Sequence, residues 1–577
     1  MSTKKSNKKG SVTFDGFGGI DRTRSHVSAT AAEDIVNFRI LPDGSLSKRC
    51  GYYPMSDVGH RIRAYHYTME GGRGLLYVLA FKNFISIDAE TGIQKLLGTV
   101  NTDKGNGLIF TYGDHVFVAD GEALYRYSDG ELTEVKGYVP LIGKEWGVHH
   151  PKEVHEPRNI LTRKARINYV IPDVPIALLP TKYAVESIDA IYVNKLRYPS
   201  DDSIINDTYL TIDISGLEEG DVVDVYLTYK DPLEEQKKNI FNSMSAVLFG
   251  TDNGCYMFLG SGNGSGRIFS NEYVDKDNLV QSQTIYPESD DIYFPIDYEF
   301  RIGSGFNEVR AITSNQEKLF IFTAGDVWMS YPESAGKVEM PATGISAEAG
   351  CSSLGGAVKI DNDIASLGAR SVWRWEYASA FPNDCRGKRI SEAVDEDISK
   401  TGIENCGIFY DHTKRELWVY SRISDEAWIY NEAMNAWYKF DNIGADSMFL
   451  LGEKLCFFKN ACLYAFDDEL EHDKNQYNEP LEIHAHYTTS ITDFGSDKLK
   501  NLSSLSISGD LSGAPVSVTV ETDRGETDRF TLSDTTGAHH SLLRCRANSN
   551  RFRYASFKIE ADPAVKQRIH GFSAFTR

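Results

Sequence analysis

The glycines of GSGNGSGR, over residues 260–267, are the residues best suited by type to binding a phosphate. A phosphate loop uses such glycines to bring backbone N–H groups to the anion, and a helix starting directly after them adds its positive end. This stretch lacks the Gly-Lys-Ser/Thr ending of a P-loop, and its spacing does not match a dinucleotide turn. No helical pattern follows it, so we expect a flexible loop between blades.

Histidines and carboxylates gather at His149, His150, Glu153, His155 and Glu156, a mixture that could suggest a metal site. Their spacing does not reproduce H-E-x-x-H or a zinc-ligand pattern, and the nearby prolines indicate a loop. The eight cysteines contain no C-x-x-C pair, so we expect small buried thiols in reducing surroundings. The sequence therefore predicts neither a metal site nor a cofactor.

Motifs for hydrolysis are incomplete in this chain. The Asp-box of sialidases, Ser-x-Asp-x-Gly-x-x-Trp, is approached by SDGEL at 128–132, which lacks the tryptophan. No G-x-S-x-G stands in a strand-turn-helix setting. We expect no enzyme. A glycan hydrolase or lyase with paired carboxylates in the mouth of a propeller remains open as an alternative.

Short apolar and aromatic runs, broken by Gly, Asp and Asn, are the elements that must position these residues. About seven units of this form occur, each able to form an antiparallel meander of three or four strands. Two lie within 75–135, and the others lie at 245–260, 309–331, 357–377, 406–442 and 447–466. Repeated meanders that must hide their edge strands are typical of a propeller. We predict an all-β chain with a β-propeller of about six to eight blades.

Two further segments alternate apolar and polar residues, and they predict an inserted β-sandwich and a C-terminal β-sandwich domain. The expected division is a disordered basic arm, a hairpin with the first blades, the inserted sandwich, the remaining blades and the C-terminal sandwich. The expected boundaries are 1–12, 13–150, 151–240, 241–477 and 478–577. A helix of one or two turns is expected over 232–242, leading back to the blades.

A hairpin is expected near the start of the chain, over residues 37–55. Pro42 and Gly44 suit the corners of its turn. We expect the hairpin to hold the N-terminal segment against the propeller and to supply a strand that closes the last blade. Lys48 and Arg49 are expected to pair with carboxylates at that seam or on a neighbouring subunit, and the alternative is that both are solvated.

Charge limits the classes of partner. The expected arm is basic because of Lys4, Lys5, Lys8 and Lys9, and it either keeps the chain soluble or docks on an acidic partner or DNA. The formal net charge of the whole chain is −21, which disfavours sequence-reading DNA binding but suits a wall past which DNA slides. No apolar run approaches about 20 residues, so no membrane-spanning segment is expected, and the lysine-rich start does not form a secretory signal.

The opening of the chain resembles that of the tail nozzle and packaged-DNA stabilisation (neck) proteins of tailed bacteriophages. The matching motifs are Phe17-Gly18-Gly19-Ile20-Asp21, then Ala32-Glu33-Asp34 with Asn37, then Pro42 through Tyr52. Segments similar to those of the same family follow in order at 261–273, 293–305, 308–331, 344–375 and 427–442.

This resemblance implies a non-enzymatic structural protein of the virion tail or neck, assembled in the host cytoplasm, with a β-propeller core. Such proteins form a ring with copies of themselves, commonly a hexamer, below the portal and its adaptor. The ring extends or closes the exit channel for phage DNA without reading its sequence. The alternative is a propeller-type receptor-binding protein that recognises host-surface glycan through aromatic residues such as Trp373, Trp375 and Trp437.

Overall fold

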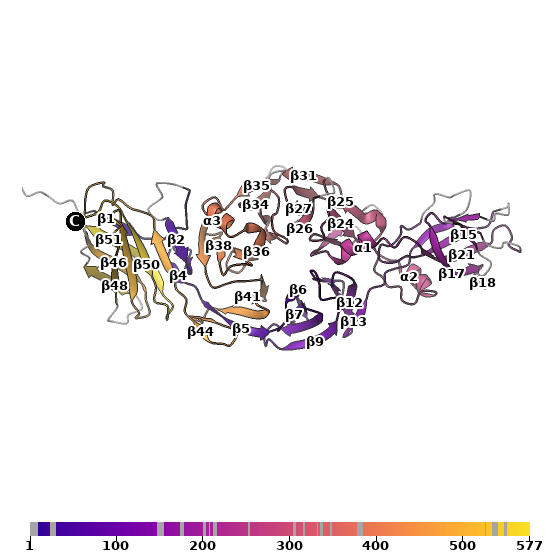
Figure 1. Ribbon diagram of the computed structural model, residues 1–577, viewed down its shortest axis with the longest axis horizontal. Coiled ribbons are helices and arrows are strands. Elements are labelled where there is room, and N and C mark those ends of the chain that lie inside the picture. Colours follow the sequence, from indigo (N-terminus) through magenta and orange to yellow (C-terminus); the bar gives the residue numbers. More distant parts are fainter. Residues whose placement is uncertain are drawn as a thin grey trace, which may run out of the picture.

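A computed structural model gives the fold of the chain, which consists almost entirely of β-strands (Figure 1). The structure describes residues 10–23, 31–146, 155–172, 178–199, 204–206, 208–211, 216–251, 254–303, 307–315, 318–331, 333–334, 338–346, 349–377, 385–525, 527–533, 541–546 and 551–577. Three bodies follow one another along the long axis, with a ring of sheets in the middle, the C-terminal strands at one end and a body inserted in the chain before residue 230 at the other (Figure 1).

The ring is a propeller, and within the described residues it has seven blades of four antiparallel strands each. Blade one has β6 (Ile62–Glu70), β7 (Arg73–Ala80), β8 (Asn83–Asp88) and β9 (Gln94–Thr99), and blade two has β10 (Leu108–Tyr112), β11 (His115–Ala119), β12 (Leu124–Ser128) and β13 (Glu131–Glu134). Blade three has β22 (Ser245–Thr251), β23 (Gly254–Gly260), β24 (Arg267–Ser270) and β25 (Glu299–Arg301).

Blade four has β26 (Val309–Asn315), β27 (Lys318–Thr323), β28 (Val327–Ser330) and β31 (Ala342–Ser346), and blade five has β32 (Ala357–Ile360), β33 (Asp363–Leu367), β34 (Val372–Tyr377) and β35 (Cys385–Arg389). Blade six has β36 (Cys406–Asp411), β37 (Glu416–Ser421), β38 (Ala427–Asn431) and β39 (Ala436–Phe440). Blade seven takes β40 (Ser447–Leu451), β41 (Lys454–Lys459) and β42 (Cys462–Asp467) from this part of the chain, and its outer strand is β5 (Gly51–Asp57).

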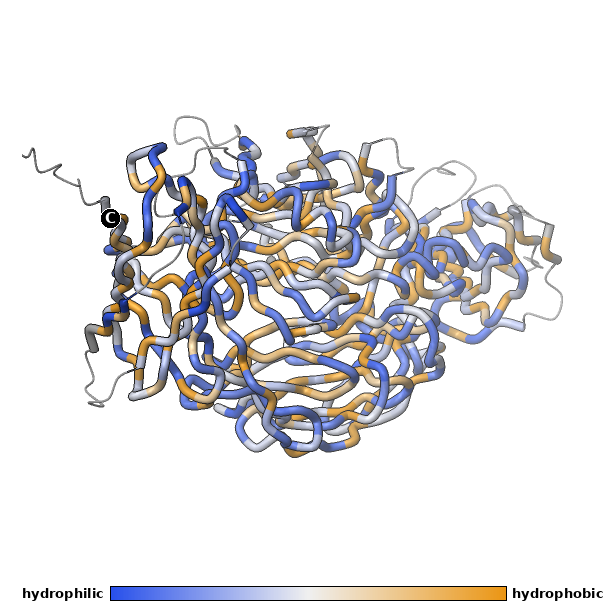
Figure 2. Tube along the Cα trace, turned by 60° about the vertical axis from the view of Figure 1, so that its left-hand side comes forward, coloured by the Kyte–Doolittle hydropathy of each residue, from blue (hydrophilic) through white to orange (hydrophobic). Residues whose placement is uncertain are grey.

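Apolar contacts between neighbouring blades hold the ring together. Each pair of neighbours buries a shared cluster, and the cluster between blades seven and one joins Phe449 and Phe458 to Leu76 and Val78. Figure 2 shows apolar segments running along successive strands through the middle of the molecule. Because β5 pairs with β42 over Gly51–Asp57, the predicted closure of the last blade by an N-terminal strand is confirmed.

The inserted body lies between blades two and three and has its own core. A five-stranded sheet, in the order β14 (Leu141–Trp146), β15 (Lys164–Val170), β21 (Val222–Tyr229), β17 (Val185–Val193) and β18 (Leu196–Tyr198), packs with the short strands β16 (Leu178–Pro180), β19 (Ile204–Asn206) and β20 (Tyr209–Thr211). The sequence placed the start of this body at residue 151. The structure places it at Leu141, because β14 pairs in parallel with β15.

The C-terminal body is a sandwich that also uses N-terminal strands. One sheet has β2 (Ala32–Val36), β45 (His486–Thr489), β50 (Ala555–Glu560), β47 (Val516–Thr522) and β48 (Thr527–Leu532), and β2 also joins it to blade six through β39. The other sheet has β3 (Phe38–Ile40), β4 (Leu46–Lys48), β51 (Arg568–Thr576), β46 (Leu502–Asp510) and β49 (Ser541–Arg546), with β1 (Ser11–Phe14) beside β51. The sequence grouped residues 13–150 as an N-terminal hairpin with the first blades, whereas the structure places β1 to β4 in the sandwich, and β1 begins inside the expected arm.

The remaining elements are short: α1 (Glu234–Phe241), α2 (Lys276–Gln283), α3 (Asp395–Lys400), η1 (Ile296–Tyr298), η2 (Ile403–Asn405), β29 (Glu333–Ser334), β30 (Val338–Glu339), β43 (Asp473–Lys474) and β44 (Pro480–Leu481). The predicted helix over 232–242 is confirmed by α1. The glycine-rich stretch 260–267 connects β23 to β24 within blade three, so the prediction of a loop between blades was wrong. None of the helices in the described ranges has the length and apolarity needed to cross a bilayer.

Candidate functional site

Lys48 and Arg49, which the sequence singled out in the N-terminal hairpin, lie at a seam. We define this seam as the place where the chain passes from the β3–β4 hairpin into β5. The turn of the hairpin uses Gly44 at φ +78°, a conformation that glycine adopts without strain. Strand β4 pairs with β51 of the C-terminal sandwich, and β5 pairs with β42 of blade seven. The seam therefore joins these two bodies through a few residues, from Lys48 to Tyr52.

Arg49 is the central side chain of the seam. Its guanidinium forms a two-pronged ion pair with Asp473, with Nη1–Oδ1 and Nη2–Oδ2 distances of 2.7 and 2.6 Å, and neither side chain is exposed. Burial alone lowers the pKa of Arg49, but the Asp473 carboxylate outweighs burial, so the net shift is upward. The prediction that Arg49 pairs with a carboxylate at the seam is confirmed, within the chain.

Asn37 completes the surroundings of this ion pair. Its Oδ1 accepts from Arg49 Nε at 2.9 Å and from the Asp441 backbone N–H at 3.1 Å, while its Nδ2 donates to the His484 carbonyl at 2.8 Å. Asn37 has φ +58°, in the left-handed region that asparagine tolerates better than most residues. The sequence marked Asn37 only as part of a motif. It gave no signal for Asp473, whose position depends on a contact 424 residues away in the chain.

Lys48 does not pair with a carboxylate, so that part of the prediction was wrong. Its Nζ donates to the carbonyls of Asp562, Pro563 and Val565 at 3.1, 2.5 and 3.0 Å. Burial lowers the pKa of Lys48 to about 8, even though Asp562 acts in the other direction. Lys48 and Arg49 are each only 1% exposed, so neither is available to a neighbouring subunit. Lys4, Lys5, Lys8 and Lys9 lie outside the described residues.

Two glycines of the same motifs permit close backbone approaches. A Cβ on Gly51 would lie 1.9 Å from the His472 carbonyl oxygen, and a Cβ on Gly19 would lie 2.8 Å from the Trp437 backbone nitrogen. No side chain fits at either distance. Tyr52 follows Gly51 and donates its hydroxyl to the Asn442 carbonyl at 2.6 Å. Glycine is thus required where the N-terminal segment crosses β39 and where it enters blade seven.

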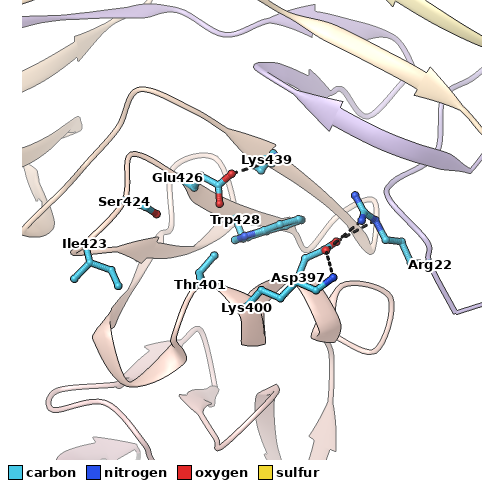
Figure 3. A pocket seen from close by; sticks show the side chains of 9 residues that line it. All are labelled: Arg22, Asp397, Lys400, Thr401, Ile423, Ser424, Glu426, Trp428 and Lys439. Atoms are coloured by element: carbon cyan, nitrogen blue, oxygen red, sulfur yellow. Dashed lines mark hydrogen bonds and ion pairs between the residues drawn. The ribbon is translucent and has the colours of Figure 1, made fainter.

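A pocket of about 460 Å³ lies between α3, blade six and the N-terminal segment (Figure 3). Trp428 forms its floor, and Lys439 Nζ lies 5.6 Å from the centre of the indole ring. Arg22 pairs with Asp397 at 3.0 Å, and Lys439 lies 3.6 Å from Glu426. Since these charges are already paired, the pocket offers polar contacts on an aromatic floor rather than a group prepared for catalysis. It is lined by Arg22, Asp397, Lys400, Thr401, Ile423, Ser424, Glu426, Trp428 and Lys439.

The tryptophans that the glycan alternative relied on are mostly in the core. Trp375 is 1% and Trp437 is 2% exposed, and their indole N–H groups donate to Ser366 Oγ and to the Ile390 carbonyl. Trp373 stacks on Trp375 with ring centres 6.3 Å apart. Trp375 and Trp437 therefore cannot bind a glycan.

Metal and thiol chemistry has no centre in the described part of the chain. No group of three or more His, Cys, Asp or Glu side chains within the described ranges is arranged to hold a metal ion. His149, His150 and Glu153 lie outside those ranges. Six of the eight cysteines are buried, as the sequence predicted for most of them.

Comparisons with known proteins found only distant structural similarity. No family model matches the chain, and no curated protein matches it. Two putative 6-phosphogluconolactonases, from Bacteroides fragilis and Bacteroides uniformis, share 11% identity, cover 76% and 75% of this chain and 95% of their own, and have TM-scores of 0.34 and 0.31. A mitotic checkpoint complex shares 9% identity over 78% of this chain and 98% of its own, with a TM-score of 0.30. Similarity this low carries no argument about activity.

Proposed function

We propose that this protein is a structural subunit of a tailed-bacteriophage virion, and that copies of it form a ring in the tail or neck that extends or closes the DNA exit channel. One observation supports this most. Of the motif residues that resemble the nozzle and neck proteins, Asn37, Lys48, Arg49, Gly51 and Tyr52 serve the seam between propeller and sandwich, and Gly19 lies where the N-terminal segment crosses β39 of blade six.

The positions of these residues account for the motifs in physical terms. A buried ion pair, a carbonyl-bound lysine and two glycines at contact distance fix how the sandwich sits on the propeller. A ring subunit needs that rigidity, because identical interfaces close a ring only if every copy has the same shape. The two β-bodies at opposite ends of the propeller give the subunit separate faces for neighbours (Figure 1).

The mass of the full-length chain in solution tests the proposal. Native mass spectrometry and negative-stain imaging should be run at about 1 and 50 µM protein, at low and physiological salt. We expect closed rings of one stoichiometry at the higher concentration, and the resemblance to nozzle and neck proteins favours six copies per ring. A monomer under all of these conditions would contradict a ring that assembles from this chain alone.

A receptor-binding role remains the second candidate. The burial of Trp375 and Trp437 counts against this role. It would have to use a different surface.

A further inference from the structure

The outer strands of the blades differ in charge, and two of them stand apart. Strand β35 of blade five has three basic residues and no acidic one, and its Arg386, Lys388 and Arg389 are exposed. Strand β13 of blade two has two glutamates and no basic residue, and both Glu131 and Glu134 are exposed. The other five outer strands that the structure describes each have a net charge of one at most. One propeller therefore carries a basic edge and an acidic edge.

Strand β35 leaves one side of its backbone without a strand partner. Within the described residues it pairs only with β34. The Ile390 N–H donates to the Val372 carbonyl at 3.0 Å, and the direction of the backbone groups alternates along an antiparallel strand. The N–H and C=O groups of Gly387 and Arg389 therefore point away from β34. An edge of this kind is a template for another strand.

Strand β13 has a free edge of the same kind. Among the described strands it pairs only with β12. The Val135 N–H donates to the Leu124 carbonyl at 2.8 Å, so the backbone groups of Leu132 and Glu134 point away from β12. Leu96 of the neighbouring strand β9 is 60% exposed, so exposed apolar surface lies near the acidic edge. Apolar surface with charges around it is typical of a protein interface.

The two edges lie on different sides of the propeller. Blades three and four separate blade two from blade five, and in Figure 1 β35 runs along the upper side and β13 along the lower side. The two edges of one copy therefore cannot pair with each other, whereas the basic edge of one copy can meet the acidic edge of the next. Repetition of such a contact between two different surfaces gives a closed ring or a filament.

We infer that β35 of one copy pairs with β13 of a second copy as antiparallel edge strands, so that one sheet runs from subunit to subunit. The pairing depends on the ring assembly proposed above and gives that ring its contact surfaces. When Arg389 faces Leu132, Glu131 lies diagonal to Lys388 and Glu134 lies diagonal to Arg389, positions that long side chains span. Main-chain hydrogen bonds supply affinity, and the charges select which edges meet.

Some charges on the two strands already have partners within the chain. Arg389 pairs with Asp395, and Glu134 lies 2.9 Å from Lys136. Ion pairs at an exposed surface contribute little to stability, so they rearrange when a strand of opposite charge arrives. Within the described residues neither Lys388 nor Glu131 forms an ion pair, so substitutions at these two positions test the contact without breaking a pair inside the chain.

Charge reversal tests the pairing, with self-association of the full-length chain measured by sedimentation from about 1 to about 300 µM. K388E and E131K should each raise the concentration for half-assembly at least about tenfold, because like charges then face each other. An equimolar mixture of K388E and E131K should recover assembly, since every mixed contact joins opposite charges. K359E on β32 of blade five and E122K on the β11–β12 turn of blade two are matched controls and should assemble like the wild type.

The outcomes separate the contact from the ring. Wild-type rings that persist in K388E and E131K would overturn the pairing and leave the ring assembly standing. A wild type that forms only dimers or open chains, and loses them in K388E, would contradict the ring but support the pairing. No self-association up to about 300 µM would overturn both. Loss of binding to a short DNA duplex in K388E, with assembly unchanged, would make β35 a DNA contact and overturn the pairing.

Discussion

Lys48 and Arg49 are neighbours in sequence and both are buried, but their charges are met in different ways. Arg49 has a carboxylate at 2.6 Å, whereas Lys48 has three carbonyl oxygens. A full opposite charge offsets the cost of burying an ion better than carbonyl dipoles do. The pKa of Arg49 is accordingly raised, and the pKa of Lys48 is lowered. The pKa shifts of the two residues therefore have opposite signs, and we expect the free energy of unfolding to depend on each residue in a different way.

Removing one partner of the Arg49–Asp473 pair should destabilise the fold strongly. In D473N the guanidinium stays buried without its counter-ion, and we expect the free energy of unfolding to fall by about 3–5 kcal/mol. Urea titration followed by fluorescence measures this change. The double variant R49M/D473M should recover part of the loss, because it leaves no buried charge. K400Q, which removes the exposed pair with Glu396, is the control and should leave the midpoint unchanged.

Lys48 should make stability rise with pH. Its pKa is about 8 in the folded chain and near 10.5 when unfolded, so the unfolded state holds more protons between these values. The cost of burying the charged amine is present in full below pH 8 and is lost as the pH rises toward 10.5. Relative to K48M, the wild type should gain about 1–3 kcal/mol between pH 7 and 10.5. A constant difference between the two proteins would show that Lys48 does not titrate.

Strand β5 shows what a single element contributes to the propeller. It is made early in the chain but completes a blade whose other strands are β40, β41 and β42. Tyr52 anchors it, because its ring packs against Phe457, Tyr464 and Phe466 at centre distances of 5.0 to 5.7 Å. The closure of a propeller by strands from two distant parts of the chain removes an open edge.

Truncating Tyr52 should loosen blade seven before the other blades. We expect Y52A to cost about 3–5 kcal/mol, as other large-to-small aromatic changes in cores do, and Y52F about 1–2 kcal/mol through the lost hydrogen bond to Asn442. Hydrogen exchange should rise first in β5 and β42. Y477A serves as a matched control because Tyr477 is 74% exposed. Equal acceleration of exchange in all blades would contradict a local role.

The sequence predicted the blades well because each is a local pattern, with alternating apolar residues and turn signals a few positions apart. It also predicted that the hairpin over residues 37–55 would supply a strand to the last blade. It could not predict that β1 to β4 belong to the C-terminal sandwich, since their partners, such as Phe575 for Ser11, lie hundreds of residues away. For the same reason Arg49 could be marked as an ion-pair residue but Asp473 could not.

At the scale of the whole molecule, the sandwich is a composite of two ends of the described chain. Blade six and the sandwich share one nine-stranded sheet through β2. Their cores also form one continuous cluster, which includes Ile35, Trp418 and Phe557. The boundary at residue 478, which separates two patterns in the sequence, therefore does not separate two folding units.

Residues 478–577 alone should not fold cooperatively. The fragment lacks β1 to β4, so β45 and β51 lose strand partners and the apolar face of the sandwich is exposed. Thermal unfolding followed by circular dichroism should show no sharp transition. Joining residues 10–50 to the fragment through a flexible linker should restore one. A cooperative transition in the short fragment would show that the N-terminal strands are dispensable.

The shared sandwich also sets an order of events during synthesis. Strands β1 to β4 leave the ribosome early, but β51, which pairs with β1 and β4, is made more than 500 residues after them. At about 5–20 residues per second, these strands wait roughly half a minute to two minutes for their partner. A chain truncated by a premature stop codon would lack β51. Its sandwich, and the contacts that fix the sandwich on the propeller, would not form. Only chains translated through β51 can therefore form the whole sandwich.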